Sequence, residues 1–169
     1  FPTKSKRSPN RFIISFSIHA LSVAKNRSEF GFSFKRDFIA PNCASTCEKD
    51  RTARVYLPDC YDESKEYPVM YILHGYWGHD NSMAEDEGCQ NIIGKMIKAG
   101  ECEEMIVVFP DIFASKTKSS CDGMNDENNK AYDNCLNDIT RDLMPYIEEN
   151  YSCLTGRENT AVCTRLRVC

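Results

Sequence analysis

The sequence lacks the features that would place it in a membrane, at a metal ion or on nucleic acid. No uninterrupted apolar run reaches the length of about 18–20 residues that a membrane-spanning helix requires. There is no Cys-x-x-Cys pair, and the three histidines are not placed to complete a zinc site. An excess of positive charge is also missing, because the net charge is −4. We therefore expect no membrane, metal or nucleic acid partner.

The chain does contain enough material for one folded domain. It has 169 residues, of which 41% are hydrophobic and 27% are charged, a profile typical of folded rather than disordered chains. A chain of this size buries about 70% of the surface that its unfolded form exposes. Many α/β enzymes, however, need about 200–250 residues for one complete domain. The chain is thus long enough for a core and short for an α/β enzyme.

Charge divides the chain into two regions. Residues 1–36 carry eight basic side chains against one acid, Glu29, whereas residues 37–169 carry 13 basic and 24 acidic side chains. The step predicts a basic leader over residues 1–40 and a separate domain over residues 41–169. Within the leader, an apolar stretch from Phe12 to Ala24 follows the basic residues, with Ser22 and Ala24 at the −3 and −1 positions of a cleavage point. This pattern resembles a secretory signal peptide and predicts an extracellular protein, the alternative being an unstructured leader.

Cysteine is unusually frequent. Ten cysteines is well above ordinary usage for this length, and the even count is what an oxidising compartment favours. Two interpretations stay open at this point. Either structural bridges form, for which Cys43–Cys47 and Cys121–Cys135 are the candidates, or the cysteines are buried thiols that act as small hydrophobic residues.

Two continuous apolar runs predict strands that are buried on both faces. They are "VMYILHG" over residues 69–75 and "MIVVFPD" over residues 105–111. Shorter β-prone runs at 53–58 and from 159 onward predict further strands. Since helical patterns alternate with these strands, we expect parallel pairing with right-handed crossovers, and the fold class is α/β.

Two helices are expected between the strands. The first covers residues 82–100, with Ser82 as N-cap, Glu85 three residues on and Gly100 just past the end. The second covers residues 132–151, where Pro145 either kinks the helix or lies where a kink is tolerated. Its apolar stripe consists of Leu136, Ile139, Leu143 and Ile147.

The segment "LHGYWGHD", from Leu73 to Asp80, is the most informative for function. It follows a buried strand, and ligands of parallel sheets bind beyond the carboxyl ends of the strands. Gly75 and Gly78 allow the backbone to turn sharply, so its N–H groups could hold a developing oxyanion. The alternative is a tight strand-to-helix turn with no further role.

The runs "ARVYLPDCYDESKEYPVMYILHG", "MIVVFPD", "YDNCLNDITRDLMPYIEENYS" and "GRENTAV" occur in an order and spacing that resemble the esterase branch of the α/β-hydrolase superfamily. The nearest likeness is to carbohydrate esterase family 1, the feruloyl and acetyl-xylan esterases that act in xylan degradation. The resemblance covers residues 52–162. It implies the N-terminal portion of an α/β-hydrolase, with a parallel-sheet core and flanking helices. The implied reaction is hydrolysis of a small-molecule or polysaccharide ester by Ser, His and an acid, without a cofactor.

The resemblance also assigns roles to individual residues. It implies an oxyanion-hole loop at His74, Gly75 and Tyr76, in which the Tyr76 backbone N–H is the donor and His74 has a supporting role. Trp77 either lines an aromatic acyl pocket or caps the edge of the core. His79 is expected to be a solvent-facing loop residue.

The chain departs from the family pattern at the nucleophile elbow. Counting from "GRENTAV", the catalytic serine should be residue 166, but Leu166 stands there, and Thr164 replaces the first elbow glycine. Cys163 and Cys169 have no identifiable base and are not expected to substitute. We expect no catalytic Ser, acid or His in these residues and hence an inactive fragment. We also expect the tail from Cys163 to be the out-of-frame or miscalled end of a longer gene.

Other interpretations of function remain. Asp133, Asp138 and Asp142 resemble catalytic carboxylates, but their helical spacing predicts a solvated face. Besides a fragment of an ester hydrolase, the chain could be a non-catalytic binding fragment of the same fold or an acyltransferase of the same branch. The sequence does not indicate the acyl and sugar specificity or the oligomeric state.

Overall fold

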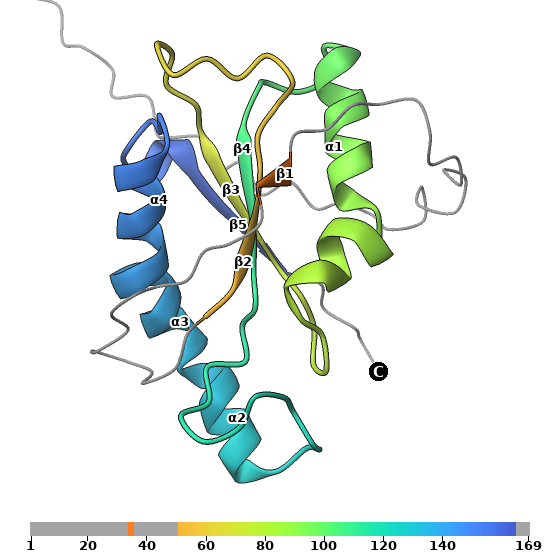
Figure 1. Cartoon of the computed structure of the whole chain (residues 1–169), viewed down its shortest axis with the longest axis vertical. Helices are drawn as coiled ribbons and strands as arrows, with labels where there is room; N and C mark the ends of the chain where they lie inside the picture. Colours follow the sequence, from red (N-terminus) through yellow and green to blue (C-terminus); the bar gives the residue numbers. More distant parts are fainter. Residues whose placement is uncertain (1–33, 36–50, 165–169) are drawn as a thin grey trace, which may run out of the picture. The chain divides into compact units, whose positions relative to one another are not determined.

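A five-stranded mixed sheet forms the centre of the part of the chain that this computed structural model describes, residues 34–35 and 51–164 (Figure 1). Its strands, in the order β1-β2-β4-β3-β5, are β1 (Phe34–Lys35), β2 (Ala53–Tyr56), β4 (Ile106–Pro110), β3 (Val69–Leu73) and β5 (Thr160–Thr164). The rest of the expected leader, 1–40, and Leu166 lie outside the described residues. The division into leader and domain stays a prediction.

The three strands that the sequence separates by helices are parallel. β3 pairs in parallel with both β4 and β5, while β2 runs antiparallel to β1 and β4. β4 is buried along its whole length, and β3 is buried except at Leu73. The predictions of an α/β fold and of two strands that are buried on both faces are confirmed.

Helices cover both faces of the sheet (Figure 1). On one face lies α1 (Cys89–Lys98), preceded by a π-helical turn at Ser82–Asp86. The other face is covered by α3 (Cys135–Asp138), a π-helical turn at Ile139–Leu143, and α4 (Met144–Asn150). Two further elements are α2 (Asp126–Asp133), at the end of the sheet where β4 finishes, and a 3-10 turn at Arg157–Asn159 before β5.

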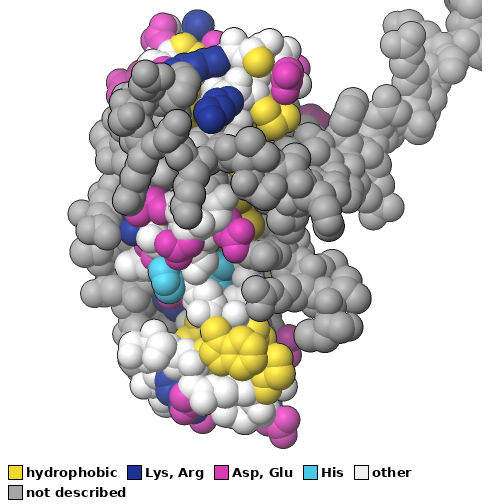
Figure 2. Space-filling view, turned by 90° about the vertical axis from the view of Figure 1, so that its right-hand side faces the viewer, with side chains coloured by type: hydrophobic (Ala, Val, Ile, Leu, Met, Phe, Trp, Pro, Cys, Tyr) yellow, Lys and Arg dark blue, Asp and Glu magenta, His cyan; other side chains and the backbone are white. Residues whose placement is uncertain are grey.

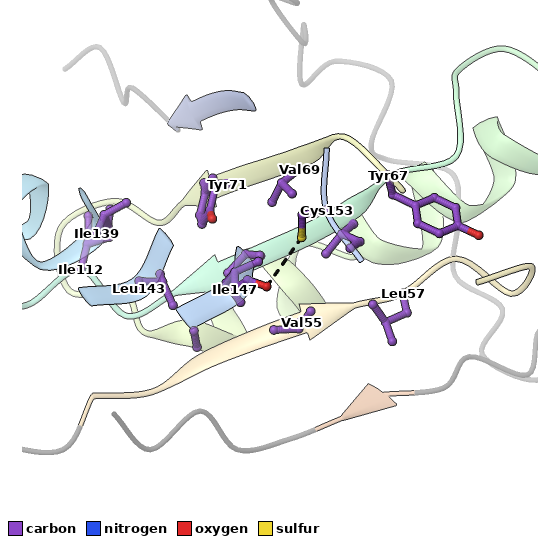
Figure 3. Close-up of a cluster of buried hydrophobic side chains, with 13 residues drawn as sticks. Val55, Leu57, Tyr67, Val69, Tyr71, Ile112, Ile139, Leu143, Ile147 and Cys153 are labelled. Atoms are coloured by element: carbon purple, nitrogen blue, oxygen red, sulfur yellow. Dashed lines mark hydrogen bonds between the residues drawn. The ribbon is translucent and has the colours of Figure 1, made fainter. Parts of the chain in front are cut away.

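The core consists of two clusters, one on each face. The cluster under α3 and α4 joins side chains of β2, β3 and β4 to three buried residues of the helical segment, Ile139, Leu143 and Ile147 (Figure 3). The cluster under α1 includes Met70, Ile72 and Ile93. Because each strand alternates its side chains between the faces, both clusters draw on the same strands.

The predicted first helix is interrupted. Ser82 is not an N-cap, because its Oγ accepts the His79 N–H at 3.0 Å and no side-chain cap forms. The end of the helix is as expected. Gly100 adopts a left-handed φ of +71°, and its N–H donates to Ile97 O while the Glu101 N–H donates to Met96 O, a Schellman termination.

The predicted second helix is also broken, and its stripe is partly wrong. Leu136 is exposed, whereas the other three residues of the stripe are buried. Asp138 does not belong to a solvated face but is buried against Arg51, unlike the exposed Asp133. Pro145 lies in the first turn of α4, directly after the π-helical turn, a position in which helices tolerate proline.

Cysteines 121 and 135 are both free thiols, so the bridge considered for them does not form. The other candidate, Cys43–Cys47, lies outside the described residues. No helix in the described part of the chain is long and apolar enough to cross a membrane.

Candidate functional site

The carboxyl ends of the parallel strands meet at one edge of the sheet. Leu73, the last residue of β3, lies beside Thr164, the last residue of β5, and Asp111 follows β4 directly. The segment from His74 to Gly78 leaves β3 at this edge and reaches α2, which lies at the same end of the molecule (Figure 1). The sequence-predicted oxyanion loop is therefore at the position where α/β sheets bind ligands.

Residues Gly75 to Gly78 form a tight turn. The Gly78 N–H donates to Gly75 O at 3.1 Å, and Trp77, in the third position, has a φ of +61°. A left-handed residue in this position is the mark of a type II turn, which normally takes glycine or asparagine there. Holding a tryptophan in this conformation costs about 1–3 kcal/mol. The surrounding contacts must therefore fix the turn.

The buried side chain of His74 holds the turn in place from the protein interior. Its ring is 2% exposed, Nδ1 lies 2.7 Å from Gly75 O, and Nε2 accepts the Ile112 N–H at 2.9 Å. Since a carbonyl oxygen can only accept, Nδ1 carries the proton and Nε2 does not. His74 is thus a neutral imidazole of defined tautomer that joins the loop after β3 to the loop after β4.

Gly78 packs directly on this ring. A Cβ on Gly78 would lie 2.6 Å from Nδ1 and 2.8 Å from Cγ of His74, closer than any real contact. A side chain at position 78 would therefore push the imidazole out of place.

Asp111 lies on the other side of the imidazole. Its Oδ1 accepts the Phe113 N–H at 2.8 Å and lies 3.4 Å from Nε2 of His74. Burial raises the pKa of Asp111. The neighbouring His74 ring, the Phe113 N–H and the Arg51 charge lower it, and the net pKa lies below the ordinary value. The carboxylate is therefore ionised at neutral pH, and the loop after β4 is held in one conformation.

The backbone N–H of Tyr76 remains available. It belongs to the same peptide group as Gly75 O, which accepts from His74 and from Gly78. In a trans peptide the N–H points away from the C=O, and no cis peptide occurs in the described residues. Among residues 51–164 no acceptor is found for the Tyr76 N–H. An oxyanion at this edge would meet an N–H donor that no other group occupies.

Aromatic side chains surround the turn. Tyr76 Oη donates to Asn129 Oδ1 at 2.6 Å, and the Trp77 N–H donates to Tyr132 Oη at 3.1 Å, which ties the turn to α2. The rings of Tyr76 and Tyr132 are 4.3 Å apart, and those of Tyr76 and Trp77 are 5.0 Å apart. Trp77 is 58% exposed, and Figure 2 shows hydrophobic side chains gathered in an exposed patch on a face that also carries histidine. Such a surface suits the face of a planar ring.

Sequence reasoning located His74, Gly75, Tyr76 and Trp77 on one turn, but it missed their partners. Arg51, Ile112 and Tyr132 contact this turn directly or through a neighbour, and no local pattern marks them. Asp111 could have been found, since it directly follows a buried strand. His79 is exposed, as expected.

Groups of three or more potential ligands that could hold a metal ion are not found in the described ranges.

Comparison with known proteins gives a consistent result. The family model described as "Putative esterase" matches residues 44–163. Among curated proteins, the endo-1,4-beta-xylanase Y of Acetivibrio thermocellus is 29% identical over 103 residues, which are 60% of this chain and 8% of that protein.

Solved structures agree. The carbohydrate esterase family 1 ferulic acid esterase AmCE1/Fae1A of the anaerobic fungus Anaeromyces mucronatus is 38% identical, with a TM-score of 0.69 over 83% of this chain and 52% of that chain. A second ferulic acid esterase is 25% identical, with a TM-score of 0.61 over 80% of this chain and 51% of that one. The chain thus spans about half the length of these solved relatives. Because the family match extends over most of the 169 residues, this chain belongs to the esterase family.

Proposed function

We propose that this chain supplies the oxyanion-binding half of a carboxylic-ester hydrolase that acts on acylated plant cell-wall polysaccharide. The observation that carries the proposal is the Tyr76 backbone N–H at the carboxyl end of β3, with no acceptor among the described residues. Family membership supports the reaction class. Secretion is part of the proposal and is supported by the signal-like pattern from Phe12 to Ala24.

The Tyr76 N–H would stabilise the tetrahedral intermediate of ester hydrolysis. When a nucleophile attacks the ester carbonyl, its oxygen becomes an oxyanion, and a fixed N–H donor lowers the energy of that state more than that of the substrate. The turn is held by His74 on one side and Tyr132 on the other, so it need not rearrange during the reaction. One donor of this kind contributes a factor of about 10²–10³ in kcat.

The nucleophile itself is not among these residues. The position that matches the catalytic serine is Leu166, and the sequence contains no Gly-x-Ser-x-Gly motif. Loss of the serine of a serine hydrolase lowers turnover by about 10⁶. We therefore propose that the 169 residues alone do not hydrolyse esters, and that the Ser, His and acid of the reaction come from outside them.

Trp77 favours an aromatic acyl group over acetate. Its indole is 58% exposed, next to the proposed oxyanion donor and in contact with the Tyr76 ring. A feruloyl ring can stack on this surface, whereas an acetyl group offers no ring. The Anaeromyces mucronatus esterase has also been solved in complex with ferulic acid, which supports the same acyl class.

A hybrid protein tests the proposal. Residues 1–163 of this chain are joined to the C-terminal half of the Anaeromyces mucronatus esterase, and hydrolysis of methyl ferulate and p-nitrophenyl acetate is measured. In this hybrid, Tyr76→Pro removes the backbone N–H together with the phenol ring, and proline fits the backbone because it is favoured in the second position of a type II turn. We expect kcat to fall by about 10²–10³. The matched control is Tyr76→Ala, which removes the same phenol ring but keeps the N–H and is expected to retain a kcat at least tenfold above that of Tyr76→Pro.

Two results would contradict the proposal. One is full turnover of the Tyr76→Pro hybrid, which would exclude this N–H as oxyanion donor. The other is hydrolysis of methyl ferulate by the 169-residue chain above the rate of its heat-denatured sample, which would exclude the assignment of the missing nucleophile. A hybrid that folds and binds ferulic acid in equilibrium dialysis, but does not turn over, would favour a binding fragment instead.

A further inference from the structure

Arg51 is a buried arginine with three hydrogen-bonded partners near the carboxyl edge of the sheet. Its Nη1 donates to Phe113 O at 2.6 Å and its Nη2 donates to Asp111 O at 2.7 Å. Its Nε donates to the buried carboxylate of Asp138 at 3.2 Å. The guanidinium therefore grips the loop after β4 at two carbonyls, one on each side of Ile112.

The hydrogen bond from Arg51 to Asp111 O determines the direction of the Ile112 N–H. Asp111 C=O and Ile112 N–H belong to one peptide group, and in a trans peptide they point in opposite directions. With the carbonyl held by Arg51, the Ile112 N–H is directed away from the guanidinium, and its acceptor at 2.9 Å is Nε2 of His74.

A second peptide group repeats this arrangement on the other side of the imidazole. Nδ1 of His74 donates to Gly75 O at 2.7 Å, and the N–H of that same peptide group is the one of Tyr76. The connection from Arg51 to Tyr76 thus consists of a peptide group, an imidazole and a second peptide group. At each hydrogen bond the donor lies on the Arg51 side and the acceptor on the Tyr76 side.

We propose that Arg51 is a positioning residue for the oxyanion turn and acts through the Asp111–Ile112 peptide and the His74 ring. The role of the Tyr76 N–H in catalysis rests on the proposed function, but the chain of hydrogen bonds does not. When consecutive hydrogen bonds all run from donor to acceptor in the same direction, each bond polarises and strengthens the next one. Here the first donor is the positively charged guanidinium of Arg51. The Tyr76 N–H is consequently both aimed and polarised toward a negative charge.

An arginine is required at position 51 because its guanidinium donates to three acceptors at once: Asp111 O, Phe113 O and the Asp138 carboxylate. Lysine has a single nitrogen, which cannot reach two carbonyls and a carboxylate in this planar arrangement. Asp138 holds the fork in orientation from α3, 87 positions away in sequence. A purely stabilising arginine would affect the folding free energy without changing the state of His74.

The first measurement uses the full chain with ¹⁵N-labelled histidine and backbone. We expect NMR to show a neutral His74 with the proton on Nδ1 and a scalar coupling between the Ile112 amide nitrogen and Nε2 across their hydrogen bond. A proton on Nε2 in the unmodified chain overturns the proposal, whatever the variants do.

The second measurement compares two buried arginines. Arg51→Lys is expected to abolish the coupling to Nε2, to mix the His74 tautomers, and to speed exchange of the Ile112 amide about tenfold, the loss of roughly one hydrogen bond. The matched control is Arg54→Lys on β2, whose guanidinium contacts the carboxylates of Asp80 and Glu85. It should leave the His74 signals unchanged.

If Arg51→Lys does not fold, Asp138→Asn loosens the same fork by one ionic bond and should show a smaller change of the same kind. Unchanged His74 signals in a folded Arg51→Lys or Asp138→Asn variant overturn the proposal. These readouts need no turnover, so their failure is distinct from failure of the hydrolysis test with the hybrid.

Discussion

The imidazole of His74 occupies the space that any side chain at position 78 would need. Gly78 has no left-handed φ, so its backbone would accept other residues, and the restriction comes from the ring and the Cβ of His74. The glycine of "HGYWG" is thus explained by packing against His74, in contrast to Gly100, where the backbone conformation requires glycine.

The first prediction is that Gly78→Ala destabilises the chain by about 1–3 kcal/mol, the cost of overpacking a buried contact. Urea unfolding measures this free energy. In the background of His74→Gly the whole side chain, Cβ included, is gone, and the same substitution should cost less than about 0.5 kcal/mol. An equal cost in both backgrounds would show that the clash with His74 is not the cause.

The second prediction concerns the left-handed φ of Trp77. Trp77→Gly and Trp77→Ala both remove the indole, but only glycine relieves the backbone strain. Trp77→Gly should therefore be more stable than Trp77→Ala by about 1–2 kcal/mol in urea unfolding. Equal stabilities would mean that the turn relaxes to an ordinary φ when the indole is lost.

The third prediction concerns the buried pair of Arg51 and Asp138. Asp138→Ala leaves a buried guanidinium without its carboxylate, and we expect a loss of about 3 kcal/mol in the free energy of unfolding. Asp133→Ala, an exposed carboxylate on the same helical segment, is the control and should change stability by less than about 0.5 kcal/mol. Similar values for both would indicate that water reaches Arg51.

The fourth prediction follows from the lowered pKa of Asp111. A carboxyl whose folded-state pKa is depressed stabilises the fold above its unfolded pKa, near 3.8, and loses that contribution as the pH falls through the folded-state pKa. The unmodified chain should thus lose more stability below pH about 4 than Asp111→Asn does. Urea unfolding across this range tests the difference, with the exposed Glu149→Gln as control. Parallel pH curves for the unmodified chain and Asp111→Asn would contradict the prediction.

The fifth prediction concerns thiol reactivity. Burial, followed by the Glu148 charge, raises the pKa of Cys153 to about 11, and its thiol donates to Ile147 O inside the core (Figure 3). At pH 8 its thiolate fraction is about 100-fold lower than that of an ordinary thiol. Iodoacetamide should therefore label the exposed Cys60 before the buried Cys153, by peptide mass spectrometry. Early labelling of Cys153 under native conditions would mean that the cluster under α4 opens.

The buried strands and the functional turn could be predicted because their signals are local. Continuous apolar runs that end at glycine or proline reported β3 and β4 correctly, since burial on both faces removes the usual alternation. For the helical segment before α4, the apolar pattern did not predict correctly which residues are buried. The π-helical turn at Ile139–Leu143 has more residues per turn than an α-helix and rotates the residues before it relative to those after it. Leu136 consequently faces solvent and Asp138 faces the core.

The hydrogen-bond partners of the turn at Gly75 to Gly78 could not be predicted from local sequence patterns, for another reason. Arg51 and Asp138 are 87 positions apart, and Ile112 reaches His74 through its backbone, which carries no sequence signal. Tyr132 was expected only as part of a helix, and its hydrogen bond to the Trp77 N–H depends on how α2 is placed.

Trp77 is also the single tryptophan among the 169 residues. The near-ultraviolet emission of the whole chain, excited at the red edge where tyrosine does not absorb, therefore comes from one indole on the turn that carries the Tyr76 N–H. Its intensity and wavelength report the solvent exposure of that turn without any label. Any ring that settles on the indole, and any loosening of the turn, can be followed by the fluorescence of the native protein.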